Sequence, residues 1–323
     1  MEAFCRPIIV LSRCLEKEAC RWNGDVIRSE VVRELEPFVE YVTTCPEVAI
    51  GLGIPRDPIR AAWDDDTLHL IQPATGRDVT DAMTAYAQEF LDALGEVDGF
   101  LLKSRSPSCG VKDVKYYHST EDKAMVKEKG SGFFGGQVWE RYEHKAIEDE
   151  GRLLNFTIRE HFFTRIFTMA RCRDLRQHGT MKDLVQFQAE NKYLLMAYSQ
   201  EYQKVLGRIT ANPERRPWED VVADYEKNLG RALAAPPRFT ANINVLQHCM
   251  GYFSEQLSSG EKSFFLDSLQ QYRTGKIPLS VPLHVLRGYA VRFEEEYLLQ
   301  QTYFQPYPAA LVTISDSGKG RDR

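Results

Sequence analysis

Residues 7–15 read Pro-Ile-Ile-Val-Leu-Ser-Arg-Cys-Leu, a short apolar run that ends directly in a cysteine. Runs of this length are typical of buried strands. Further β-like runs recur along the first half, with helical patterns between them, at residues 38–42, 67–71 and 97–103. This alternation predicts an α/β fold with a Rossmann-like, mostly parallel sheet.

The second half of the chain has a different pattern. From about Leu153 onward, apolar residues recur at helical spacing and prolines and glycines separate the segments. Helices are expected near residues 153–174, 180–206, 217–234, 240–256, 260–273 and 282–300. We therefore predict an α/β domain over 1–148, an all-α domain over 149–314 and a disordered tail over 315–323.

Length and composition agree with two globular domains. The chain has 323 residues, of which 43% are hydrophobic and 27% charged, as is ordinary for proteins with packed cores. Its apolar stretches fall far short of the ~18 residues of a membrane-spanning helix. The apolar run near the N-terminus is also too short for a signal peptide. We expect a cytoplasmic protein with no membrane partner.

Charge divides the chain unevenly. Residues 1–150 carry a net charge of −10 and residues 151–323 a net charge of +5. A basic half indicates a polyanionic partner such as RNA, because Lys and Arg neutralise phosphates, although a solvated arginine-rich surface is the ordinary alternative. The first candidates for phosphate contacts crowd one predicted helix: Arg159, Arg165, Arg171, Arg173 and Arg176.

Three cysteines follow predicted strands directly. Cys14, Cys45 and Cys109 come just after the first, second and last β-like runs of the first half. Ligands of open α/β sheets bind at the carboxyl ends of the strands, so residues distant in sequence can converge there. A small buried hydrophobe is the ordinary interpretation of any one cysteine. Three at successive strand ends favour a shared ligand.

The spacing of the cysteines bears on the choice of metal. Zinc sites usually contain close cysteine pairs, whereas the nearest spacing here is Cys14 to Cys20. Widely separated thiolates on loops suit an iron-sulfur cluster, although spacing alone leaves the choice open. Three thiolates on a cubane cluster leave one iron without a protein ligand, and that iron can act as a Lewis acid toward a soft sulfur atom.

Four short motifs stand in order along the first half. They are Cys14-Leu15 with Cys20-Arg-Trp-Asn-Gly24, Cys45-Pro-Glu47 with Gly51-Leu-Gly-Ile-Pro-Arg56, Asp78-Val-Thr80, and Lys103-Ser-Arg-Ser-Pro-Ser-Cys-Gly110. In this order and spacing they resemble the thiouracil-desulfidase family over about residues 5–150. Trp22-Asn23 departs from the Tyr-Asp of that family, and this leaves the selectivity of the pocket open.

The resemblance implies a cofactor and a reaction. It implies that Cys14, Cys45 and Cys109 hold a 4Fe-4S cluster, and we expect Cys20 to be a neighbour of the cluster because a fourth thiolate would close the open iron. The implied reaction replaces the substrate sulfur with the oxygen of water, without net redox change. Glu47 is the candidate acid/base, and Ser106, ahead of Ser108, is the candidate to orient the substrate.

The second half resembles an all-helical domain that is often fused to this desulfidase. The resemblance rests on residues 192–198, 242–253 and 305–308. It implies the RNA-directed branch, which converts 4-thiouridine in tRNA to uridine with release of sulfide. Two alternatives remain open. One is a desulfidase for free thiouracil or thiouridine, a small thiopyrimidine, with a structural helical domain; the other is a non-catalytic iron-sulfur or redox-sensing protein.

Overall fold

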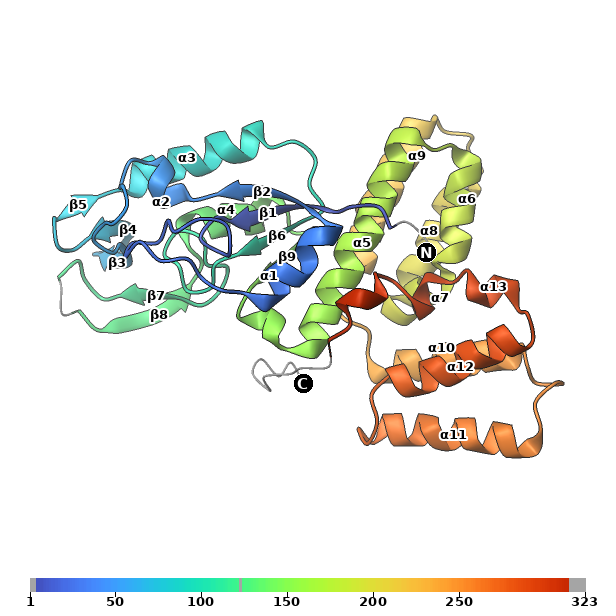
Figure 1. The fold of residues 1–323 in the computed structure, drawn as a ribbon. Coiled ribbons are helices and arrows are strands. Elements are labelled where there is room, and N and C mark those ends of the chain that lie inside the picture. The colour runs from blue at the N-terminus through green and yellow to red at the C-terminus, as the bar shows by residue number, and fades with distance from the viewer. Residues whose placement is uncertain (1–3, 122–123, 314–323) are drawn as a thin grey trace. The chain divides into compact units, whose positions relative to one another are not determined.

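The computed structural model of the chain describes residues 4–121 and 124–313 (Figure 1). These residues form two compact units. The first comprises the residues up to Ala170 together with those from Ala310 onward, and the second runs from Arg171 to Ala309. The predicted disordered tail, residues 315–323, lies outside the described residues.

Strands and helices alternate along the first unit, as the sequence predicts. Its strands are β1 (Ile8–Ser12), β2 (Glu40–Thr44), β3 (Arg60–Asp64), β4 (Thr67–Gln72), β5 (Arg77–Asp78), β6 (Gly99–Leu102), β7 (Val114–Tyr117), β8 (Val126–Gly130) and β9 (Ala146–Asp149). Its helices are α1 (Glu30–Leu35), α2 (Pro46–Ala49), α3 (Thr80–Ala93), α4 (Phe133–Arg141) and the first part of α5 (Phe156–His178).

The central sheet of the first unit is parallel throughout. Within the described residues it has four strands in the order β2-β1-β6-β9. All four residues of β6 are buried, which is typical of a strand covered on both faces. Helix α3 packs Leu91 and helix α4 packs Phe134 into the same apolar core as Val10 and Phe100 of the sheet. The mostly parallel α/β fold predicted for this half is confirmed.

A second, mixed sheet was not anticipated. It has the order β5-β4-β3-β7-β8 among the described residues, with antiparallel pairs except for the parallel pair β3·β7. The β-like run at residues 67–71 is therefore a strand, as predicted, but it belongs to this sheet and not to the parallel one. Strand β4 follows β3 after a short turn at Asp65, which has a φ of 49°, and a tight turn of this kind joins antiparallel neighbours.

The compact units divide later in the chain than the predicted boundary at 148/149. The first part of α5 packs within the first unit: Arg165 donates to the backbone carbonyl of Lys145 at 2.9 Å. A Cβ atom placed on Gly99 of β6 would lie 3.0 Å from Cγ2 of Ile166. The change from α/β to helical sequence near 150 therefore lies inside the first unit, because the start of α5 covers part of it.

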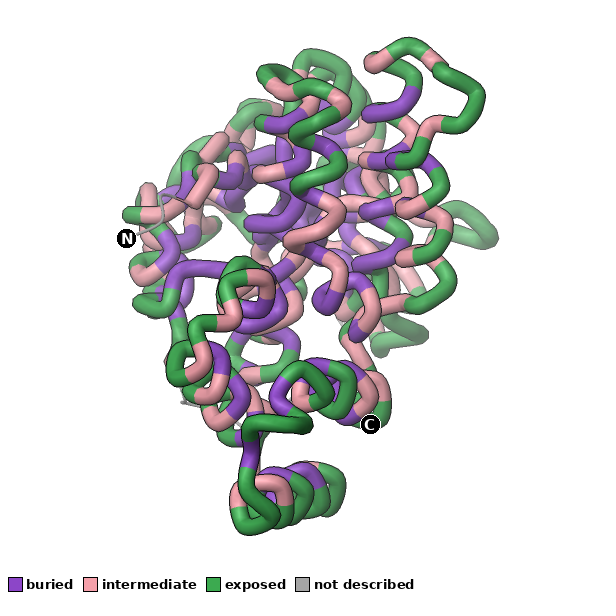
Figure 2. The backbone as a smooth tube through the Cα atoms, turned by 90° about the vertical axis from the view of Figure 1, so that its right-hand side faces the viewer, coloured by how far each residue is buried: buried purple, intermediate pink, exposed green. Residues whose placement is uncertain are grey.

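The second unit is helical. After the last residues of α5 it contains α6 (Met181–Glu190), α7 (Lys192–Tyr198), α8 (Gln200–Ala211), α9 (Trp218–Ala232), α10 (Phe239–Gly251), α11 (Ser259–Arg273), α12 (Ser280–Arg292) and α13 (Glu296–Leu299). Helix α11 buries one stripe of residues, including Phe265 and Leu269, and exposes most of its remaining surface (Figure 2). The all-α half predicted from the sequence is confirmed.

Two predicted helices are divided in the structure. The segment at 180–206 contains three helices, because Asn191 and Ser199 leave the helical conformation. The Asn191 side chain donates to the carbonyl of Phe187, and the Ser199 hydroxyl caps α8 by accepting from the amide of Tyr202. The segment at 282–300 likewise contains α12 and α13. In the described part of the chain, no helix is long and apolar enough to cross a lipid bilayer.

Candidate functional site

The three predicted ligand cysteines follow three adjacent strands of the parallel sheet. Cys45 comes directly after β2, Cys14 two residues after β1, and Cys109 in the loop after β6. The register pairs Ser12 with Thr44, so β1 and β2 end side by side. Because parallel strands present their carboxyl ends at one edge, the three loops meet at one rim of the sheet.

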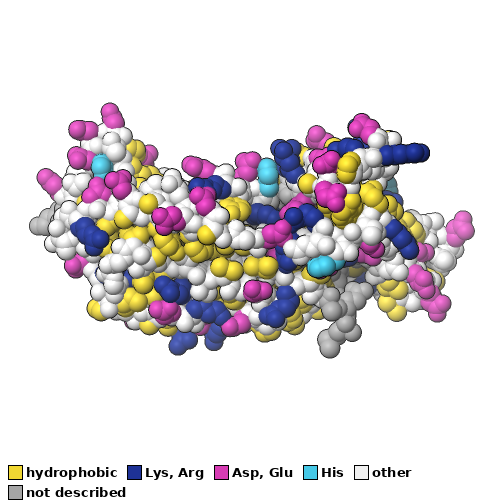
Figure 3. Space-filling view, turned by 90° about the horizontal axis from the view of Figure 1, so that it is seen from above, with side chains coloured by type: hydrophobic (Ala, Val, Ile, Leu, Met, Phe, Trp, Pro, Cys, Tyr) yellow, Lys and Arg dark blue, Asp and Glu magenta, His cyan; other side chains and the backbone are white. Residues whose placement is uncertain are grey.

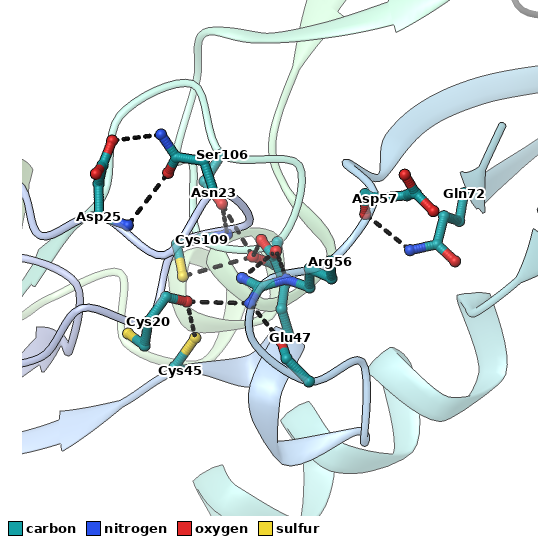
Figure 4. Close-up of polar contacts among 12 residues, drawn as sticks. Cys20, Asn23, Asp25, Cys45, Glu47, Arg56, Asp57, Gln72, Ser106 and Cys109 are labelled. Atoms are coloured by element: carbon teal, nitrogen blue, oxygen red, sulfur yellow. Dashed lines mark hydrogen bonds and ion pairs between the residues drawn. The ribbon is translucent and has the colours of Figure 1, made fainter. Parts of the chain in front are cut away.

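Cys20 brings a fourth thiol to this rim. Its side chain is buried, and its thiol is near enough to those of Cys14 and Cys45 for them to shift its pKa. The Cys45 thiol also donates to the backbone carbonyl of Cys20, with 3.8 Å between sulfur and oxygen. Figure 4 shows Cys20, Cys45 and Cys109 around the same region of the site. Cys20 is therefore a neighbour of the predicted ligands, and its role toward iron stays a prediction.

The protein environment favours the protonated form of the Cys20, Cys45 and Cys109 thiols. Burial raises the pKa of Cys109 to about 12. Hydrogen bonding to Cys20, followed by burial, raises the pKa of Cys45 well above its ordinary value. A hydrogen bond with Cys14 is the leading cause that raises the pKa of Cys20. Cysteine binds metal as thiolate, so metal binding at this rim must release protons.

The donors at this rim have the chemistry of an iron-sulfur site. Across residues 4–121 and 124–313, no three His, Cys, Asp or Glu side chains are grouped closely enough to hold one ion. The soft sulfur donors Cys14, Cys45 and Cys109, on three separate loops, have the chemistry that iron-sulfur clusters use.

Glu47 lies beside the cysteines and is held from two sides. It stands in the first turn of α2, which has Cys45 as its N-cap residue and Pro46 in its first turn. Arg56 donates to Oε2 of Glu47 from Nε at 2.9 Å and from Nη2 at 2.7 Å, while Ser108 donates to Oε1 at 2.8 Å. Only 13% of the Glu47 side chain and 3% of the Arg56 side chain are exposed. The ion pair is therefore almost entirely buried.

The hydroxyls of Ser106 and Ser108 extend this contact toward Cys109. Their Oγ atoms lie 2.9 Å apart, and the amide of Cys109 donates to the Ser106 Oγ at 3.1 Å. A hydroxyl has one proton, and Ser108 gives its proton to the Glu47 carboxylate. Ser106 must then donate to Ser108. Ser106 is half-buried and Ser108 is buried, so Ser106 is the more accessible of the two hydroxyls.

The Gly-rich stretch that leads into the first turn of α4 packs against the Cys109 loop, a role that the sequence does not reveal by itself. The amides of Phe134 and Gly135 donate to the carbonyl of Ser108 at 2.9 and 3.0 Å. A Cβ atom on Gly132 would lie 2.4 Å from that carbonyl oxygen, so glycine is required for the approach. The glycines of residues 130–136 were the available signal, because they often mark close contact with another backbone segment.

Arg56 is the second residue whose role was missed. In the sequence it stands at the end of the motif that contains Pro55-Arg56. The available signal was Glu47 itself, because a carboxylate next to a buried cysteine needs a charged or hydrogen-bonding partner. The nearby arginine of the same motif was a candidate for that partner.

The five arginines predicted to contact phosphate all lie on α5. Arg159 is buried, with 4% of its surface exposed, and donates to the carbonyls of Leu153 and Thr313 at 2.9 and 2.7 Å. Arg165 is half-buried and donates to the carbonyl of Lys145. Arg159 therefore uses its guanidinium inside the first unit, and phosphate contact by these arginines stays a prediction.

The other three arginines are half-buried. Arg171 forms an ion pair with Glu190, and Arg176 forms one with Glu226 at 3.0 Å. With about 3.6 residues per turn, Arg173 and Arg176 fall on one side of the helix and Arg171 on another. On the face drawn in Figure 3, basic side chains lie among acidic ones. Because Arg171 and Arg176 are already paired with carboxylates, α5 has little of the character of a phosphate-binding stripe.

Comparison with known proteins identifies two regions of the chain. The 2-thiouracil desulfurase family matches residues 9–150, and a family of unknown function, DUF1722, matches residues 192–308. The uncharacterised protein YbbK of Bacillus subtilis (strain 168) is 36% identical over 110 residues, which are 32% of this chain and 73% of YbbK. The uncharacterised protein YbgA of Escherichia coli (strain K12) is 28% identical over 158 residues, which are 48% of this chain and 92% of YbgA.

A solved structure is also similar to this chain. It is the [4Fe-4S]-dependent thiouracil desulfidase TudS, which is 27% identical in sequence. The match covers 46% of this chain and 93% of TudS, with a TM-score of 0.35.

Proposed function

Because the chain belongs to the 2-thiouracil desulfurase family through its residues 9–150, we propose that it removes sulfur from a free thiouracil with the help of a 4Fe-4S cluster. The observation that supports this most directly is the meeting of Cys14, Cys45 and Cys109 at the ends of three adjacent parallel strands. A carboxylate, Glu47, is held beside them.

The cysteines are the proposed ligands of the cluster. When bound, a 4Fe-4S cluster with three thiolate ligands supplies one iron that can polarise a thiocarbonyl sulfur. Cys45 and Cys109 are buried, so the protein shields their thiols from solvent. Cys20 lies against Cys14 and Cys45 as a neighbour, and in this proposal it leaves the reactive iron open.

The residues around the cysteines supply the acid/base chemistry. Water adds its oxygen to the ring carbon and the sulfur leaves as hydrogen sulfide, so the reaction exchanges no electrons with another reactant. Glu47 takes a proton from the attacking water and returns it toward the leaving sulfur or a ring nitrogen. Ser106 binds and orients the base through its accessible hydroxyl, and Ser108 links that hydroxyl to Glu47.

The alternative substrate is 4-thiouridine within transfer RNA. The net charge of +5 over residues 151–323 favours it. The buried and ion-paired arginines of α5 weigh against it, because phosphate binding needs accessible cations. A free thiopyrimidine therefore fits the described residues better, and the second unit needs no part in the chemistry.

One experiment tests the proposal and separates the substrates. The full-length protein, reconstituted anaerobically with iron and sulfide, is incubated with 2-thiouracil, 4-thiouracil and thiolated transfer RNA, and uracil and sulfide are quantified. We expect equal amounts of uracil and sulfide from a free base, at a rate that hardly changes between ~50 and ~200 mM salt. Cluster-free protein serves as the control.

The possible results lead to different conclusions. No sulfide release from any substrate by iron-loaded protein would rule out the desulfidase. Release from transfer RNA alone, falling steeply with salt, would assign the RNA-directed reaction in its place, because phosphate contacts make binding salt-dependent.

A further inference from the structure

We propose that Arg56 is a positioning residue that sets the orientation of the Glu47 carboxylate in the desulfidase reaction. The inference rests on the proposed function, since it assigns Arg56 a part in that same site. Arg56 is neither a proposed cluster ligand nor a proposed acid/base residue. Its hydrogen bonds go to the Glu47 carboxylate and to backbone carbonyls such as that of Cys20.

The Arg56 side chain can be buried because its hydrogen-bond donors all have partners nearby. Only 3% of the Arg56 side chain is exposed. Burying a charged guanidinium group strongly destabilises a protein unless its N–H groups donate hydrogen bonds. Nε and Nη2 both donate to Oε2 of Glu47. Nη1 donates to the carbonyls of Cys20 at 3.1 Å and Gly53 at 2.9 Å. Arg56 therefore connects the segment of Cys20, helix α2 and the loop that follows α2.

The geometry of the pair explains why an arginine is suited to this position. Both guanidinium donors contact the same oxygen, Oε2, and so leave Oε1 to accept from Ser108. A planar fork with fixed donor directions can hold a carboxylate in one orientation, whereas the ammonium of lysine is a point charge. Arg56 thereby turns Oε1 of Glu47 toward the Ser108 and Ser106 hydroxyls.

The short helix that carries Glu47 needs this support. Helix α2 has only four residues, and the loop after it contains Gly51 and Gly53, with φ values of 81° and 75°. A single helical turn provides little rigidity by itself. The contacts of Arg56 with Glu47 and with the Gly53 carbonyl hold the beginning of α2 and this loop together.

The test is a double-mutant cycle on the iron-loaded full-length protein with thiouracil. The variants are Arg56→Met, Arg56→Lys, Glu47→Gln and the double variant Arg56→Met/Glu47→Gln. We expect Arg56→Met to lower kcat by roughly 10²-fold with KM and iron content nearly unchanged, because small misplacements of a catalytic group have effects of this size. Arg56→Lys should restore only part of kcat. In the Glu47→Gln background, Arg56→Met should cause little further loss, because the two residues act as one unit.

Arg141→Met is the matched control. Arg141 also pairs with a carboxylate, that of Asp92, but 38% and 70% of these two side chains are exposed. We expect wild-type kcat and KM for this variant. A second readout uses cluster-free protein: each single substitution of the buried pair should lower the thermal midpoint, and the double variant should lower it by less than the sum.

The outcomes separate the inference from the proposed function. If the wild type turns over thiouracil and Arg56→Met has the same kcat as the Arg141→Met control, the inference is overturned and the proposed function stands. Equal fractional losses from Arg56→Met with and without Glu47→Gln would also overturn it, since they show independent roles. No turnover by the wild type would overturn the proposed function and the inference together. If Arg56→Met fails to fold, Arg56→Lys and the double variant complete the comparison.

Discussion

The Ser108 hydroxyl donates a hydrogen bond to Oε1 of Glu47 at 2.8 Å, although the two residues are 61 positions apart in the sequence. The contact joins the loop after β6 to the helix after β2, on either side of β1 in the sheet. Each residue is the near neighbour of a predicted ligand: Glu47 of Cys45, and Ser108 of Cys109. The proposed acid/base group and the proposed ligands therefore share the same two loops.

The first prediction concerns the cluster ligands. Replacing Cys14, Cys45 or Cys109 with Ala should abolish most iron and sulfide binding, because each removes one of the three thiolates of the proposed cluster. Iron and acid-labile sulfide are measured in anaerobically purified protein. Cys5→Ala, which lies before β1, is the control and should retain the metal content of the wild type. Iron contents like those of the wild type in all three variants would disprove the ligand assignment.

The second prediction concerns Cys20. Cys20→Ala should keep most of the cluster, because the contacts that connect Cys20 to Cys45 and Arg56 use its backbone carbonyl, which the substitution leaves in place. The absorption spectrum and the iron content of the purified variant check this. Complete loss of iron would show that Cys20 is itself a ligand.

The third prediction concerns Glu47. Glu47→Gln should retain the cluster and lose roughly 10²-fold or more in turnover, because removing a positioned acid/base group typically costs ~10²–10⁴-fold. Glutamine preserves the size of the side chain and an acceptor for Ser108, so the loss reports on proton transfer. Turnover and iron content are measured on the same preparations. Turnover near that of the wild type would move the proton transfer elsewhere, first to Ser106.

The convergence of the cysteines could be predicted because it depends on local features. Cys14, Cys45 and Cys109 each follow a recognisable strand, and parallel strands present their carboxyl ends on one edge. The partner of Glu47 could not be predicted in the same way. The Glu47–Arg56 pair depends on how the loop after α2 folds back, and residue periodicity carries no information about that loop.

Two other features could not be predicted because they depend on tertiary structure. They are the pairing of strands into sheets and the solvent exposure of side chains. Residues 67–72 form a strand as expected, but alternation of side chains does not specify which sheet a strand joins. The arginine content of α5 suggested a phosphate surface. Whether an arginine faces solvent depends on tertiary packing, and Arg159 turns inward to backbone carbonyls. Residue type alone therefore overestimated the accessible positive charge.

The fourth prediction concerns pH and Asp149, the last residue of β9. Burial raises the pKa of Asp149 to about 6 in the folded protein. A raised pKa means that the folded state keeps a proton that the unfolded state releases between about pH 4 and 6, so stability falls as pH rises through this range. Relative to Asp149→Asn, the wild type should lose on the order of 2 kcal/mol of unfolding free energy between about pH 4 and 7.

Denaturant unfolding of both cluster-free proteins at a series of pH values measures this difference. Asparagine keeps a side-chain oxygen to accept from the amide of Arg152, which lies 2.8 Å from Oδ1 of Asp149, so it removes the titration with little change in hydrogen bonding. Parallel pH profiles for the two proteins would show that Asp149 does not titrate in this range.

The fifth prediction tests the close approach of α4 to the Cys109 loop. Helix propensity favours Ala over Gly by up to ~1 kcal/mol, so Gly135→Ala would stabilise an isolated helix. In this protein the added Cβ would lie 2.3 Å from the carbonyl oxygen of Gly110 and 2.5 Å from that of Cys109. Backbone atoms cannot move aside cheaply. We therefore expect Gly135→Ala to lower the free energy of unfolding by about 1–3 kcal/mol, the usual cost of overpacking, and to lower iron content.

Gly288→Ala is the matched control for this substitution. Gly288 lies inside α12, and a Cβ atom there meets no heavy atom within 4 Å. The same change should therefore raise stability by up to ~1 kcal/mol and leave iron content unchanged. Denaturant unfolding and iron analysis of both variants measure the contrast. If Gly135→Ala stabilised the protein as Gly288→Ala is expected to, the Cys109 loop could not be packed against α4 as closely as the structure shows.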